Sequence, residues 1–86
     1  MIEGVNMKIV KIGAVWCSSC IIMKSRFNEI LNEKNIEVES LDYDTDDIDK
    51  YSIGEILPVY IRFDNNIETK RLIGEHSKEE IERFLM

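Results

Sequence analysis

An apolar segment that leads directly into a helical pattern constrains the fold of this chain more than any other feature. Residues 8–15 (KIVKIGAV) are rich in Ile and Val and do not strictly alternate, which is typical of a central strand covered on both faces. After WCSS at 16–19, apolar side chains recur with helical spacing at Met23, Phe27, Ile30 and Leu31. The junction therefore predicts the start of a parallel, right-handed βαβ unit.

The rest of the chain predicts five further elements. These are a strand over 36–43, a short helix over 44–52 capped by Asp44 or Asp46, strands over 58–63 and 67–73 joined by a turn at 64–66, and a last helix with a capping box at Ser77–Glu80. The order β-α-β-α-β-β-α indicates an α/β fold. We expect a four-stranded mixed sheet with helices on its two faces.

The length and charge of the chain limit its partners. Residues 1–86 are expected to form a single domain, in which 1–6 is a short lead-in. A net charge of −6 repels a phosphate backbone, so we expect no nucleic-acid partner. No apolar stretch is long enough to span a membrane, and the first residues, which include Glu3, lack the apolar core of a signal peptide. We therefore expect a cytoplasmic monomer without a membrane partner.

The two cysteines of the chain, Cys17 and Cys20, lie at the predicted strand–helix junction. A disulfide between them would close too short a loop to hold a fold together, so their purpose is expected to be chemical. The N-terminus of the helix favours a thiolate on Cys17. One turn of helix brings Cys20 within disulfide distance, and Cys20 is expected to be the more buried. An exposed nucleophile backed by a buried thiol is what thiol–disulfide exchange requires.

Two other interpretations of the cysteine pair are open at this point. A structural zinc site usually takes four ligands, and the only His, His76, is distant in sequence. We therefore expect no metal within one chain, although a metal shared by two chains is compatible with the sequence. The pair could also be inert core cysteines. The acidic run at 42–49 is expected to be a solvated face, since it lacks the central Gly and closing Glu of an EF-hand.

Three segments in order resemble the thioredoxin family. The first is the strand followed by WCSSC and a helix. Residues 56–63 (ILPVYIRF) resemble the family's segment of an apolar residue, a cis-proline and a strand, and residues 71–77 (RLIGEHS) resemble its last strand, groove glycine and helix cap. The resemblance covers residues 8–86. Because the extra N-terminal strand and helix of ordinary thioredoxins are missing, the chain is similar to the short, minimal, thioredoxin-like proteins.

The resemblance implies a redox-active disulfide between Cys17, the nucleophile, and Cys20, the resolving thiol. It also implies protein disulfides as substrates, a thioredoxin-reductase-like electron donor, and no cofactor beyond the disulfide itself. Two other activities remain open: a glutaredoxin-like donor that depends on glutathione, and a non-catalytic binding module. Glutaredoxins typically carry a Lys three residues before the first Cys and no Trp beside it, whereas this chain has Ala14 and Trp16 there.

A substrate groove is implied around the cysteine pair, formed by Trp16, Leu57, Pro58 and Gly74. The resemblance implies a cis bond between Leu57 and Pro58 that faces the cysteines. Each residue also has a plainer interpretation, since Pro58 could simply begin an edge strand, Gly74 could end a strand and Trp16 could pack.

The clearest departure from the family is Lys11. It stands six residues before Cys17, where the family has a buried acid. The long side chain of Lys11 could extend to water or pair with Asp42 on the neighbouring strand. Alternatively, Lys11 modulates the ionisation of Cys20. Ser18 and Ser19 replace the family's usual Gly-Pro, so the family's reduction potential does not carry over.

Overall fold

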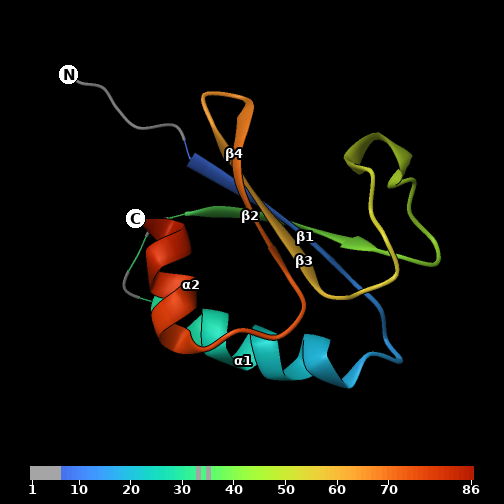
Figure 1. Cartoon of the computed structure of the whole chain (residues 1–86), viewed down its shortest axis with the longest axis horizontal. Coiled ribbons are helices and arrows are strands. Elements are labelled where there is room, and N and C mark those ends of the chain that lie inside the picture. The colour runs from blue at the N-terminus through green and yellow to red at the C-terminus, as the bar shows by residue number, and fades with distance from the viewer. Residues whose placement is uncertain (1–6, 33, 35) are drawn as a thin grey trace.

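The structure is a computed structural model that describes residues 7–32, 34 and 36–86 (Figure 1). Its elements are β1 (Met7–Gly13), α1 (Ser18–Leu31), β2 (Glu37–Asp42), the single 3₁₀ turn η1 (Asp49–Tyr51), β3 (Val59–Asp64), β4 (Ile67–Ile73) and α2 (Lys78–Leu85). The predicted lead-in at 1–6 lies outside the described residues.

The strands form one mixed sheet in the order β2-β1-β3-β4. β1 pairs parallel to β2 and antiparallel to β3, and β3 pairs antiparallel to β4. β1 is central, which explains why its Ile9, Val10 and Ile12 are at most 2% exposed. The predicted α/β fold class, with a parallel βαβ unit followed by a hairpin, is confirmed.

Both α-helices lie on the same face of the sheet, side by side in Figure 1. Their apolar faces meet Ile9 of β1 and Tyr60 of β3 in one core cluster. Within it, the ring of Phe27 stacks on that of Tyr60, with centroids 3.9 Å apart and planes 8° apart. The alternation of β1 sends Val10 and Ile12 to the other face, where they belong to a second cluster with both cysteines.

The second face of the sheet is covered by the segment between β2 and β3 instead of a full helix. The prediction of a helix over 44–52 is therefore wrong, because only η1 forms there. The Asp42 carboxylate accepts a hydrogen bond from the Asp44 N–H at 2.8 Å, and such bonds offer the backbone an alternative to helix. Neither Asp44 nor Asp46 caps η1, which begins after Ile48 without a side-chain cap.

Two local signals in the second half are confirmed. Asn65 and Asn66 have φ angles of 52° and 70°, as a tight turn between β3 and β4 requires. The capping box of α2 is complete, because the Ser77 hydroxyl accepts from the Glu80 N–H and the Glu80 carboxylate accepts from the Ser77 N–H. In the part of the chain described here, no helix has the length and apolar character needed to cross a membrane.

Candidate functional site

Cys17 is the N-cap of α1. The chain leaves β1 at Gly13 and turns, and the Cys17 N–H donates to the Ala14 carbonyl at 3.2 Å. The Cys17 Sγ then accepts a hydrogen bond from the backbone N–H of Cys20, also at 3.2 Å. A donor aimed at sulfur at the positive end of a helix stabilises negative charge there. The cap thus places a hydrogen-bond donor and the N-terminal end of α1 beside the Cys17 sulfur.

The expected difference in burial between the two cysteines is absent. Cys17 is 8% exposed and Cys20 is 7% exposed. The reason is the cap itself, since Cys17 turns its sulfur back toward the helix and away from solvent. Burial, and then the hydrogen bond with Cys17, raise the pKa of Cys20 to about 11, while the Lys11 charge acts in the opposite direction.

Gly13 lies directly against Cys20, a contact that the sequence does not reveal. A Cβ at Gly13 would stand 3.2 Å from the Cys20 Sγ and 3.6 Å from its Cβ. Any side chain at this position would press on the sulfur. The end of β1 therefore supports the position of Cys20 by lacking a side chain.

The Leu57–Pro58 bond is cis, as the resemblance implies. Leu57 is buried in the same apolar cluster as the two cysteines. The Pro58 carbonyl accepts a hydrogen bond from the Gly74 N–H at 2.8 Å, which brings the start of β3 and the end of β4 together. Gly74 has a φ of +84°, and a Cβ there would approach the Ile56 side chain to 3.3 Å, so the position favours glycine on two counts.

Trp16 is mostly exposed and is held in place by polar and aromatic contacts. Its Nε1–H donates to the Asp44 carboxylate at 2.7 Å. Its ring meets that of Tyr43 edge-on, with centroids 6.3 Å apart. Asp44 lies 28 residues further along the chain, so no local pattern could have predicted this contact.

Exposed apolar side chains adjoin each part of the site. Four side chains that are at least half exposed lie within two residues of Cys17, Leu57 or Gly74, namely Val15, Trp16, Ile56 and Ile73. Ile21, next to Cys20, is exposed to a similar extent, as are Ile67 and Met86 elsewhere on the chain. Exposed apolar side chains that gather in one region are typical of an interaction surface.

Lys11 of β1 lies close to Cys20 of α1, beside a hollow that both residues line. It is half-buried on β1, opposite Ser40 of β2 and Tyr60 of β3. Burial, and then the charge of Lys24, lower the pKa of Lys11 from its ordinary value. Lys11 and Cys20 both line one hollow of about 350 Å³. The suggested pairing with Asp42 is not found, since no ion pair joins Lys11 to any residue within the described ranges.

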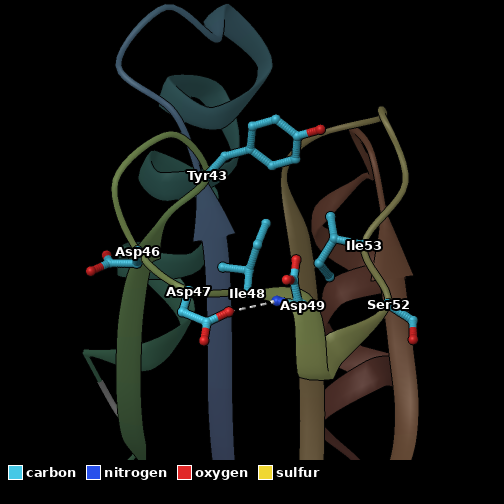
Figure 2. A pocket seen from close by; sticks show the side chains of 7 residues that line it. All are labelled: Tyr43, Asp46, Asp47, Ile48, Asp49, Ser52 and Ile53. Atoms are coloured by element: carbon cyan, nitrogen blue, oxygen red, sulfur yellow. Dashed lines mark hydrogen bonds between the residues drawn. The ribbon is translucent and has the colours of Figure 1, made fainter.

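The acidic segment between β2 and η1 lines a separate hollow of about 490 Å³, shown in Figure 2. Asp46, Asp47 and Asp49 line it, but their carboxylates point in different directions. Asp47 accepts a hydrogen bond from the Asp49 N–H at 3.2 Å. Over residues 7–32, 34 and 36–86, no group of three or more His, Cys, Asp or Glu side chains is arranged to hold a metal ion.

Comparison with known proteins rests on structure alone. No protein-family model matches the chain, and no curated protein matches it in sequence. The chain is similar to Trxlp from Edwardsiella tarda, with a TM-score of 0.85 and 21% identity over 94% of this chain and 82% of that one. It is also similar to thioredoxin-2 of a malaria parasite, with a TM-score of 0.82 and 17% identity over 96% and 84%. A third similar structure is the reduced Schistosoma mansoni thioredoxin pre-protein, with a TM-score of 0.80 and 22% identity over 93% of this chain and 76% of that one.

Proposed function

We propose that this chain, which has the thioredoxin fold and a cysteine pair at the start of α1, is a thiol–disulfide oxidoreductase that reduces protein disulfides. The observation that carries the proposal is the hydrogen bond from the Cys20 N–H to the Cys17 Sγ at the N-terminus of a helix. It supports Cys17 as the nucleophile and leaves Cys20, one turn on, as the resolving thiol.

The exchange proceeds in two steps. The Cys17 thiolate attacks one sulfur of the substrate disulfide, forms a Cys17–substrate bond and releases the other sulfur as a thiolate, which takes up a proton. Cys20 then loses its proton and attacks the Cys17 Sγ. A Cys17–Cys20 disulfide forms, and the second substrate sulfur leaves with the electron pair. The substrate gains two electrons, the cysteine pair loses two, and an external dithiol donor must return them.

The state of Cys20 supports a reducing direction. A couple becomes oxidising when the protein stabilises its reduced form, for example as thiolates. Burial provides no such stabilisation at Cys20, because it raises the pKa to about 11 and keeps the thiol protonated near neutral pH. We expect a reduction potential nearer to about −270 mV than to about −120 mV.

The surroundings of the cysteines support a protein as substrate. Val15 and Trp16 precede Cys17, and Ile56 and Ile73 flank the Leu57–Pro58 and Gly74 segments; all four are exposed by 50% or more. Apolar surface of this kind suits an extended polypeptide better than a small charged thiol. Trp16, Leu57, Pro58 and Gly74 are therefore the proposed groove residues.

Reduction of insulin by the protein in the presence of dithiothreitol tests the activity. Wild type should accelerate the reaction, and Cys17→Ser should abolish it. With a disulfide-containing substrate, Cys20→Ser should accumulate a mixed disulfide at Cys17, because the resolving thiol is gone. Wild-type activity equal to the dithiothreitol background would favour a binding module instead.

The electron donor is a second question with its own test. We propose a thioredoxin-reductase-like donor in the cytoplasm. The oxidised protein should accept electrons from such a reductase and NADPH faster than from glutathione at matched concentrations. Faster recycling by glutathione would show a glutaredoxin-like activity, while leaving the exchange chemistry at Cys17 and Cys20 intact.

A further inference from the structure

A smaller hollow of about 140 Å³ lies on the helical side of the sheet, between α1 and the three strands β1, β2 and β3. Lys11, Lys24 and Ser40 line it, and the same three residues also line the hollow that reaches Cys20. Tyr60 forms part of the wall of the smaller hollow. The two spaces therefore adjoin through one polar edge.

The hydroxyl of Tyr60 has no hydrogen-bond partner among the residues that the structure describes, although Tyr60 is only 1% exposed. A buried polar group without a partner is rare in folded proteins and destabilises them. The ring cannot turn the hydroxyl toward solvent, because it stacks on Phe27 at 3.9 Å. Burial raises the pKa of Tyr60, so the hydroxyl keeps its proton and can donate it to an acceptor.

Two lysines bring positive charge to the same space. Lys11 is half-buried, and the charge of Lys24 lowers the pKa of Lys11, so the two ammonium groups repel each other. None of the described residues that line the smaller hollow is acidic, whereas Asp42 and Asp46 line the adjoining hollow. An anion between the two lysines would remove the repulsion and supply the acceptor that the Tyr60 hydroxyl lacks.

The remaining walls are apolar and select among anions. Phe27, Leu31 and Val38 line the hollow together with the polar residues. A fully hydrated ion such as phosphate gains nothing from these side chains. A carboxylate with a short hydrocarbon chain can place its charged end at the lysines and its tail against the apolar wall.

We propose that this hollow is a binding site for a small aliphatic carboxylate. Its carboxylate group lies between Lys11 and Lys24 and accepts a hydrogen bond from the Tyr60 hydroxyl. Its tail packs against Phe27 and Leu31. The site shares Lys11 with the surroundings of Cys20 but is lined by neither cysteine, so binding there does not depend on the proposed activity.

Nuclear magnetic resonance titration of the reduced protein with sodium acetate, propionate and butyrate tests the proposal, with sodium chloride at equal ionic strength as the reference. Saturable shifts should appear at the amides of Lys11, Phe27 and Tyr60. The affinity should rise by about fourfold for each added methylene until the hollow is full. Sodium phosphate should bind more weakly than butyrate.

Variants locate the binding. Tyr60→Phe keeps the stacked ring and should lower butyrate affinity by about fivefold or more, since one hydrogen bond to a charged group is lost. Lys11→Met should lower it by about tenfold or more. Lys50→Met, which removes an exposed lysine of η1, is the matched control and should leave the affinity unchanged. Shifts that do not saturate, or an affinity that neither Tyr60→Phe nor Lys11→Met changes, would overturn the proposal.

Discussion

Replacing Lys11 by methionine should slow the resolving step, because Lys11 carries a positive charge that favours the Cys20 thiolate. The pKa of Cys20 is raised from 9.0 to about 11, mainly by burial. At pH 7 this lowers the thiolate fraction by about a hundredfold, equivalent to roughly 3 kcal/mol. Intrinsic nucleophilicity rises with pKa and offsets about tenfold of this loss. Attack by Cys20 is thus about tenfold slower than attack by an ordinary thiol.

Loss of the Lys11 charge adds to this barrier. At an effective dielectric constant of about 20, a nearby unit charge contributes on the order of 1 kcal/mol. This reduces the thiolate fraction by about fivefold and, after the gain in nucleophilicity, the rate by about two- to threefold. The difference should be largest near neutral pH and should shrink as Lys11 itself deprotonates, which begins below its ordinary pKa of 10.5.

The assay starts from a mixed disulfide between Cys17 and thionitrobenzoate, in buffer without carboxylate. Attack by Cys20 releases the coloured thiolate, and stopped-flow absorbance gives the rate between pH 6 and 10. Lys24→Met is the matched control, because Lys24 acts on the pKa of Lys11 and is not among the causes of the Cys20 shift. A Lys11→Met protein that resolves as fast as wild type, or a Lys24→Met protein that is slowed equally, would refute the reasoning.

Three further predictions follow from the same contacts. The pKa of Cys20 is raised from 9.0 to about 11, so the stability that its protonated thiol contributes is complete below pH 9 and is lost as the pH rises to about 11. Urea unfolding should therefore show the free energy of unfolding falling by roughly 3 kcal/mol over this range in wild type and not in Cys20→Ala. The pKa of Lys11 is lowered, so its contribution to the stability of the fold is present only above pH 10.5 and is lost as the pH falls. Lys11→Met should therefore raise the melting temperature at pH 7, and a lower melting temperature than wild type would contradict this. A Cβ at Gly13 would lie 3.2 Å from the Cys20 Sγ, so Gly13→Ala should destabilise the fold by about 1–3 kcal/mol in urea unfolding and slow the attack of Cys20 on the mixed disulfide. Gly54→Ala is the control and should not displace Cys20, because a Cβ at Gly54 meets nothing within 4 Å.

The parts of the fold that were predictable from sequence depend on local signals. The Ile- and Val-rich segment at 8–15, the capping box at Ser77 and the asparagine turn all act over a few residues, and each is found in the structure. The segment 44–52 was mispredicted because its aspartates look like helix caps in sequence, while Asp42 instead bonds to the local backbone.

The part of the site that lies at the junction of β1 and α1 was predictable from sequence. Cys17 and Cys20 are adjacent in sequence to the turn that positions them. Their equal burial, the contact of Gly13 with Cys20, and the unpartnered Tyr60 hydroxyl depend on how separate strands and α1 pack. Tertiary arrangement of this kind leaves no periodic or spacing signal in the chain.

The strand order places β2 and β4 at the two open edges of the sheet. Both edges carry charged side chains along the strand, with Glu37 and Glu39 on β2 and Glu68 and Lys70 on β4. Charges on an edge strand discourage the backbone of another molecule from adding to the sheet. Aggregation through strand pairing is thus disfavoured at both edges of the sheet.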